Sequence, residues 1–395
     1  MLTVIVSILV FGFLIFIHEF GHYITARIFK VTISEFSIGM GPRLFTWTSK
    51  KTNIRYSIAL FPIGGFVAMP GENGEYNECE GNAENNDDER SENAAQLKES
   101  VALHENAEAD ESDAENRNAE DDPYRDDPNT FGKKPAWQRL IITAAGAAIN
   151  IIFGFLAMIL LTCLINIGNT RVAEFHNAKD LGTEPISMKT GLRVGDEIIR
   201  VNGKRVRILD ELSYEIMRYG NEPVDLTIIR DGEEITLEDV VFPTQTEQGQ
   251  SFGIMDFKVN RVKKTFGSVM TFSWSKATLI VRMVWESLYD LITGRYSFAA
   301  VSGPVGISSA IGSAAKAGFT SLLYITVLIS INLGVMNLLP IPALDGGRLL
   351  TLIIEMITKK KLPAKVEGMI NGIGLMLLLG LSVLIMVKDV FQLIF

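Results

Sequence analysis

The chain has 395 residues, of which 47% are hydrophobic, and its positive mean hydropathy of +0.22 indicates a membrane protein with soluble insertions. The net charge of -9 is misleading, because residues 72–128 hold 21 acidic and four basic residues, a local charge of -17, and the rest of the chain therefore carries +8. The two cysteines, Cys79 and Cys163, exclude a disulfide framework and a cysteine zinc ribbon.

The first predicted element is a transmembrane helix over residues 1–30. Residues 1–17 carry no charge, and the helical pattern continues to Ala26, which gives a length of roughly 25 to 40 Å. A cleavable signal peptide fits less well, because no basic segment precedes the apolar run and no small-x-small site follows it.

His18, Glu19 and His22 form an H-E-x-x-H pattern at the end of this apolar run. On a helix the two histidines share one face and can reach one metal ion, while Glu19 can act as general base on a water at that ion. Each ionisable group near the centre of a membrane helix costs about 2.5 to 3.5 kcal/mol. Three such groups within five residues therefore indicate a zinc-hydrolase site rather than a chance match.

Residues 31–72 alternate polar and apolar side chains and contain a turn at Gly64 and Gly65, which favours short strands. Strands cannot lie bare in lipid, so we expect this segment to pack against the helices or to line a water-accessible cavity. We interpret it as a membrane re-entrant β-loop; a soluble hairpin is the alternative.

Residues 73–132 form an acidic insertion that is rich in Glu, Asn, Asp and Ala. Such a composition buries too little apolar surface to offset the entropy of ordering, so we predict disorder. The insertion has no D-x-D-x-D-G loop of the kind that binds calcium.

The second transmembrane helix is predicted over residues 133–168, with Lys133, Lys134 and Trp137 at the membrane interface. Its small residues, beginning at Gly146, would allow another helix to approach closely. Asn150 has two equally supported interpretations, as an interhelical hydrogen-bond donor or as a group that faces the active site.

A soluble α+β domain is predicted over residues 171–245. Residues 191–203 read G-L-x-x-G-D-x-I-x-x-V-N-G, which resembles a PDZ domain, a fold that accepts an extended peptide as an added strand. A helix over residues 209–219 and a hairpin through Asp231 and Gly232 follow.

Three further membrane elements complete the predicted fold. Residues 258–318 are amphipathic, as expected of helices that lie along a membrane surface. Residues 319–358 contain the third transmembrane helix, which is broken near two prolines, and residues 366–395 the fourth. The predicted fold is a polytopic α-helical membrane protein with about four transmembrane helices, a re-entrant β element and an inserted α+β PDZ domain.

A catalytic zinc ion takes three protein ligands, and the third must be found outside the first helix. The other two histidines are unsuitable, because His104 lies in the acidic insertion and His176 at the edge of the soluble domain. A carboxylate is the usual substitute. Asp345, where two prolines end a helix beside Gly-Gly, is the strongest candidate; Glu355 is second, and Asp389 lies too near the terminus.

Together these motifs resemble the site-2 protease family of intramembrane zinc metalloproteases, in its bacterial RseP/RasP type. The resemblance rests on H-E-F-G-H in a first span, a PDZ domain after the second, and N-x-x-x-x-N-x-x-P-x-P-x-L-D-G-G in the third. It covers nearly the whole chain except the acidic insertion. There are two departures: Gly146 to Asn150 lacks the proline of the usual G-P-x-x-N turn, and one PDZ domain is present where two are usual.

The resemblance implies one zinc ion per chain, bound by His18, His22 and Asp345, with Glu19 activating water. It also implies that residues 36–72 are the family's membrane re-entrant β-loop. Candidate substrate-binding residues are Asn332, Asn337, Pro340, Pro342, Gly64, Gly65 and Asn150.

Basic residues predict the orientation, because they flank the first and last connections and so place both on the cytoplasmic side. We therefore expect a multi-pass protein of the bacterial cytoplasmic membrane with an extracytoplasmic PDZ domain. The basic residues in question are Arg27, Lys30, Lys133, Lys134, Arg139, Arg348, Lys359, Lys360, Lys361 and Lys365.

The expected function is cleavage of single-pass membrane proteins already trimmed by an upstream site-1 protease, and the resemblance implies anti-sigma factors and remnant signal peptides as substrates. Membrane lipids are further expected partners, and nucleic acid is not. The alternative is a catalytically idle scaffold that binds partners through its PDZ domain, but a structural metal site would not need Glu19. A metal transporter would need more polar residues across several spans.

Overall fold

The computed structural model describes residues 2–72, 124, 126–176, 185–247, 250–295 and 301–394. Most of the predicted acidic insertion, residues 73–123, lies outside the described residues. The predicted disorder does not extend to its last residues: a short 3-10 helix, η1 (Phe131–Lys133), begins inside the predicted insertion, and Phe131 is buried in an apolar cluster.

Four helices in the described part of the chain are long and apolar enough to cross a membrane, as the prediction of a multi-pass helical protein requires. Uncharged apolar stretches of about 20 residues or more form such helices because every backbone group is then satisfied within the segment. The four are α1 (Leu2–Ile28), α4 (Ala136–Leu164), α10 (Phe319–Leu338) and α12 (Ala364–Ile394).

Helix α4 is the centre of the helical part and contacts α1, α8, α10 and α11. Glycine allows the closest approach to α10: a Cβ on Gly154 would lie 2.5 Å from Ile331 Cγ1, and one on Gly334 would lie 2.8 Å from the Ala147 carbonyl oxygen. An apolar core fills the space between α4, α8 and α10; it consists of Ala157, Met158, Leu161, Ile280, Val284, Val327, Ile331 and Val335.

Two long, bent strands, β1 (Glu35–Thr48) and β2 (Arg55–Ala68), form a small sheet beside α1. The bends let Phe36 pair with both Tyr56 and Val67. The strands expected over residues 31–72 are thus present, whereas their re-entry into a membrane stays a prediction.

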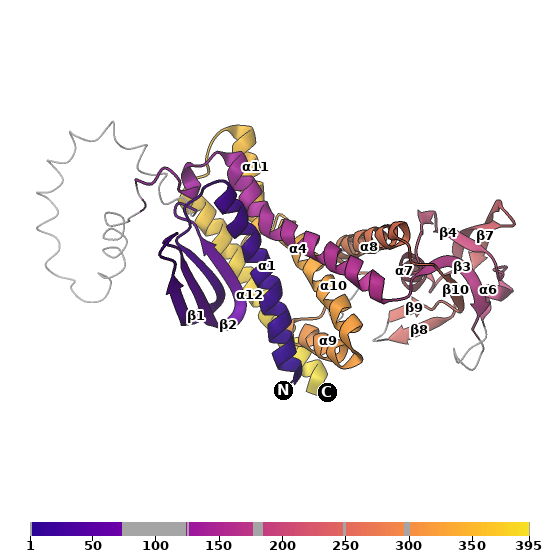
Figure 1. The fold of residues 1–395 in the computed structure, drawn as a ribbon. Coiled ribbons are helices and arrows are strands. Elements are labelled where there is room, and N and C mark those ends of the chain that lie inside the picture. Colours follow the sequence, from indigo (N-terminus) through magenta and orange to yellow (C-terminus); the bar gives the residue numbers. More distant parts are fainter. Residues whose placement is uncertain are drawn as a thin grey trace, which may run out of the picture.

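A separate α/β domain occupies the opposite end of the molecule from β1 and β2 (Figure 1). Its main sheet has the order β10-β3-β4-β6-β7, with β5 paired to β4, and a β8–β9 hairpin lies beside it. The elements are β3 (Gly168–Phe175), α6 (Ile186–Lys189), β4 (Glu197–Val201), β5 (Lys204–Arg205), α7 (Leu209–Tyr219), β6 (Val224–Arg230), β7 (Glu233–Val240), β8 (Thr244–Glu247), β9 (Gln250–Gly253) and β10 (Phe257–Arg261).

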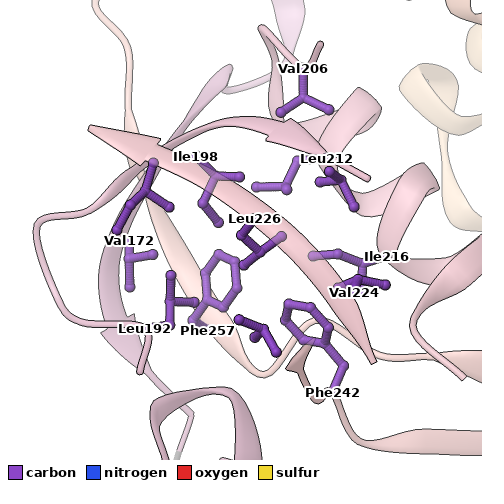
Figure 2. Packing of buried hydrophobic residues seen from close by; sticks show 13 residues of the cluster. Val172, Leu192, Ile198, Val206, Leu212, Ile216, Val224, Leu226, Phe242 and Phe257 are labelled. Carbon is purple, nitrogen blue, oxygen red and sulfur yellow. The ribbon is translucent and has the colours of Figure 1, made fainter. Parts of the chain in front are cut away.

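The core of this domain is formed by alternate residues of the strands and by the inner face of α7 (Figure 2). Phe257 of β10 is fully buried in it, and β10 pairs with β3. The domain therefore continues to Arg261, and two predicted boundaries are wrong: the soluble domain does not end at residue 245, and residues 258–261 are not part of the surface helices. The predicted helix at residues 209–219 and the turn at Asp231 and Gly232 match the structure.

Three more helices complete the described helical part, and one of them, α8, also contacts the α/β domain. They are α8 (Phe266–Ile292), α9 (Pro304–Ala317) and α11 (Asp345–Thr358). Helix α8 contacts α7 on one side and α4 and α10 on the other, and α9 contacts α1, α10 and α12. Helix α1 begins and α12 finishes at the same end of the helical part (Figure 1).

Candidate metal centre

His18 and His22 lie on one face of α1, because residues four apart on a helix are separated by about one turn. Their ring centroids are 4.9 Å apart and their Nε2 atoms 3.3 Å apart. Both residues are less than one tenth exposed, as is Glu19 between them. Two imidazole nitrogens thus point at the same buried spot.

Asp345 reaches this spot from the other end of the sequence, as the first residue of α11. Its Oδ2 atom lies 3.1 Å from His18 Nε2 and 3.3 Å from His22 Nε2. In the described part of the chain, these three residues are the group whose ligand atoms could hold one metal ion. Glu355 does not join them, because it forms an ion pair with Arg139.

The geometry of the three atoms fits a zinc ion. Bonds of about 2.0 to 2.2 Å in a tetrahedral site place the ligand atoms roughly 3.3 to 3.5 Å apart, close to the separations of 3.1 to 3.3 Å found here. Asp345 Oδ2 is buried and makes no hydrogen bond within the described chain. Because a buried carboxylate requires a partner, a cation between the three residues would satisfy it.

Helix α4 orients both histidines. His22 Nδ1 lies 2.9 Å from the Ile142 carbonyl oxygen, which can only accept, so Nδ1 carries the proton and Nε2 presents its lone pair to the centre. Asn150 is fully buried with its side-chain amide 3.3 Å from His18 Nδ1. Because the Asn150 Oδ1 atom has no partner among the described residues, the amide orientation in which Oδ1 accepts a hydrogen bond from His18 Nδ1–H is the better one. Of the two interpretations of Asn150, the structure favours the one in which its side chain faces the site.

Glycines make room for this arrangement. A Cβ on Gly146 would lie 2.3 Å from His22 Nε2, and one on Gly65 would lie 2.9 Å from Glu19 Cγ. The sequence predicted a close helix contact at Gly146 but not that the contact is made by the histidine rings. The sequence signal for this contact was that Gly146 lies four residues before Asn150, which places both on the same face of α4.

A cavity of about 380 Å³ opens beside the three candidate ligands, and Glu19 lines it. It is large enough for several water molecules. An ion pair between Arg348 and Glu72 borders it, and neither residue was identified from sequence as part of the site. The signal for Arg348 was its place one helical turn after Asp345. The other lining residues are His18, His22, Gly65, Phe66, Val67, Ala68, Met69, Thr143 and Asp345.

The remaining carboxylate and the other two histidines of the chain are not part of this cluster. Asp389 accepts hydrogen bonds from the backbone N–H groups of Gly303 (2.9 Å) and Gly306 (3.0 Å), at the start of α9. His176 belongs to the α/β domain, where its backbone N–H donates to the Asp256 carbonyl oxygen. His104 lies outside the described residues.

The candidate substrate-binding residues are only partly brought together. Asn332 lines a different cavity, of about 450 Å³, between α8 and α10. Pro340 and Pro342 lie in the turn before Asp345, and Asn337 lies in the last turn of α10. Gly64 has a backbone φ of 81°, in the region that favours glycine. It directly precedes Gly65, which lies against the Glu19 side chain.

Comparison with known proteins agrees with this geometry. The family model described as Peptidase family M50 matches residues 6–381. The chain is 31% identical to zinc metalloprotease RasP of Shouchella clausii over 99% of both chains, and 30% identical to zinc metalloprotease RasP of Geobacillus kaustophilus over 98% of this chain and 97% of that one. It is also 29% identical to the regulator of sigma-W protease RasP of Bacillus subtilis over 98% of both chains.

Proposed function

The chain belongs to peptidase family M50 and is a zinc metalloprotease, and from this premise we propose that it is an intramembrane endopeptidase that cuts single-pass membrane proteins. The observation that carries the proposal is the convergence of His18, His22 and Asp345 beside Glu19. Two of the three come from a helix of which the length and hydropathy suit a membrane span.

In this proposal His18 and His22 would hold the zinc ion through Nε2, and Asp345 would hold it through Oδ2. Zinc, when bound, supplies a Lewis acid that polarises the scissile carbonyl and activates water. The Ile142 carbonyl and Asn150 keep the two imidazole rings aimed at the ion.

Glu19 is the proposed general base, because it lies in the same cavity and is not needed as a ligand. Its carboxylate takes a proton from the water that attacks the scissile carbonyl carbon. It then passes that proton to the amine nitrogen as the C–N bond breaks. The cavity at Glu19 supplies the water that hydrolysis in a membrane requires.

We further propose that the substrates are proteins of which the outer domains have already been removed by a site-1 protease. Anti-sigma factors and remnant signal peptides are the substrate classes; the name of the Bacillus subtilis relative supports the first. The α/β domain, as a PDZ domain outside the bacterial cytoplasmic membrane, would exclude bulky ectodomains or bind newly formed ends. Membrane lipids surround the helices, and the zinc lies nearer the cytoplasmic face.

The test is cleavage of a tagged single-pass substrate that lacks its ectodomain, co-expressed with wild type, Glu19→Gln or Asp345→Asn. Zinc content is measured on each purified full-length protein. We expect Glu19→Gln to keep zinc and to lose cleavage at least 100-fold, because only the base is removed. Asp345→Asn is expected to lose zinc and, with it, cleavage.

A second, catalytically idle function as a scaffold predicts another outcome. If cleavage persists in Glu19→Gln, the proposed protease mechanism is wrong and binding through the α/β domain becomes the better account. If Asp345→Asn retains a full equivalent of zinc, the proposed ligand set is wrong even where Glu19 is required.

A further inference from the structure

Helix α12 touches the rest of the protein along one narrow stripe. Among its described residues only Gly374 and Asp389 are buried, and the partly buried ones lie at helical spacing between and around them. Most of its large apolar side chains are exposed, as expected of a helix that faces lipid. Its position is therefore set by a few specific contacts, and these can be examined one by one.

The first contact lies directly before the candidate metal ligand Asp345. A Cβ on Gly374 would lie 2.4 Å from Pro342 Cβ and 2.9 Å from the Pro342 carbonyl oxygen, so any side chain there would displace the loop. One helical turn earlier, Asn371 Oδ1 accepts a hydrogen bond from the Ala343 backbone N–H, at 3.4 Å. Both contacts are made to the loop of residues 339–344, which joins α10 to α11.

This loop needs support from outside. Ala343 has a φ of 70°, in the left-handed region that alanine adopts only at a cost of about 1 to 2 kcal/mol. Pro340 and Pro342 have no backbone N–H to stabilise the turn. An unsatisfied N–H at membrane depth costs several kcal/mol, so the acceptor that Asn371 offers to Ala343 favours this conformation of the loop.

The second contact fixes the other end of α12. Asp389 accepts hydrogen bonds from the backbone N–H groups of Gly303 and Gly306, at the start of α9. A carboxylate at a helix N-terminus is favourable, because it satisfies free N–H groups and complements the helix dipole. With this end held, Asn371 and Gly374 are placed in register with the loop.

We propose that α12 is a positioning element of the metal centre, in which Asn371 and Gly374 hold the 339–344 loop so that Asp345 faces His18 and His22. The inference rests on the proposed function, because it takes Asp345 as a zinc ligand. Neither Asn371 nor Gly374 would touch the metal or the substrate. Both would act through the backbone conformation of the loop.

The test compares alanine substitutions within one helix. Gly374→Ala and Asn371→Ala are the test variants. Gly372→Ala and Gly380→Ala are matched controls, because a Cβ at either control position meets no atom of the described chain within 4 Å. Asn371→Asp keeps an acceptor oxygen. Zinc affinity is measured on full-length protein in detergent by competition with a chelator, and hydrogen exchange of residues 339–347 is followed in zinc-free protein.

We expect both test variants to bind zinc about 10- to 100-fold more weakly than wild type, as is typical when groups that orient metal ligands are lost. Faster exchange in the loop should accompany this loss. The two glycine controls should stay within about twofold of wild type, and Asn371→Asp should bind more tightly than Asn371→Ala.

The proposal is overturned if the test variants bind zinc as the two controls do while Asp345→Asn loses it; the proposed function then still stands. If Asp345→Asn keeps wild-type zinc affinity, the proposed ligand set fails as well. Asn371→Ala adds no atoms, so a steric failure of Gly374→Ala to fold leaves the Asn371 comparison intact.

Discussion

At the scale of single residues, the candidate metal centre depends on α4 as much as on the ligands themselves. The Ile142 carbonyl, the missing side chain of Gly146 and the Asn150 amide all meet the two histidines. The first and last of these define which ring nitrogen faces the centre, and the glycine leaves space for the rings. Residues outside the three candidate ligands thus fix the orientation of the two imidazole rings.

Asn150 provides the clearest test at this scale. Replacing it by Ala removes the acceptor for His18 Nδ1–H, and we expect zinc affinity to fall about 10- to 100-fold. Asn150→Asp should retain most of the zinc affinity, because its carboxylate can accept the same hydrogen bond from His18 Nδ1–H. Chelator competition measures the effect. Thr162→Ala is the matched control, since Thr162 is also fully buried in α4 but bonds to Met158 and Ser273; equal loss in both variants would refute the specific role of Asn150.

At the scale of elements, charged contacts join α7 of the α/β domain to α8. Arg218 Nη2 donates a hydrogen bond to Asp290 Oδ1 (2.8 Å), Arg218 Nη1 forms an ion pair with Asp290 Oδ2 (2.5 Å), and both side chains are almost fully buried. Glu286 accepts hydrogen bonds from Lys204 (3.0 Å) and Tyr214 (2.7 Å). Helix α8 also packs on α4 and α10, so the domain is connected to the helices around the metal centre. Further pairs are Arg282 with Glu215 and Lys276 with Asp210.

Arg218→Ala should weaken this connection strongly. Breaking a buried ion pair leaves Asp290 charged and without its partner, which costs about 3 to 5 kcal/mol. Native-state hydrogen exchange of α7 and α8 in the full chain measures this as a lower free energy of local opening.

Two companion variants show whether burial is the cause. Arg171→Ala removes an exposed pair with Glu197 (2.9 Å) and should cost less than about 1 kcal/mol. Arg218→Ala combined with Asp290→Asn should recover part of the loss, because position 290 then carries no unpaired buried charge. Equal effects of Arg218→Ala and Arg171→Ala would contradict the argument.

At the scale of the whole molecule, the metal centre and the α/β domain are connected by the length of α4. The α4 helix begins next to the basic residues Lys133 and Lys134 and ends at Leu164, where the chain enters the domain. The lysines after α11 lie near the beginning of α4, since Lys361 Nζ donates to the Gly132 carbonyl oxygen. Both basic segments therefore lie at one end of the helices, as the positive-inside rule expects of a cytoplasmic side.

Labelling with a membrane-impermeant maleimide tests the resulting orientation. In a background with Cys79→Ser and Cys163→Ser, a single cysteine replaces exposed Glu238 in the domain or exposed Lys360 after α11. We expect intact bacterial spheroplasts to be labelled at position 238 only, and permeabilised ones at both. Labelling of position 360 in intact spheroplasts would reverse the predicted topology.

Local patterns were enough to predict several parts of this protein from its sequence. Uncharged apolar runs predicted the four long helices, because hydropathy and length alone decide whether a helix can span a membrane. The i, i+4 spacing placed His18 and His22 together, since a helix brings such residues onto one face whatever surrounds it. The α7 helix and the Asp231–Gly232 turn followed from local propensity in the same way.

Only the tertiary structure decided which distant residues meet. The sequence ranked Asp345 before Glu355 as the third ligand, but only the fold shows that Asp345 lies at the histidines while Glu355 pairs with Arg139 of α4. The domain extends to Arg261 because β10 pairs with β3, which lies more than 80 residues earlier. The contact of Asn371 with the loop before Asp345 likewise has no local signal. In each case the deciding contact joins segments that are far apart along the chain, and the periodicity of neither segment contains information about the other.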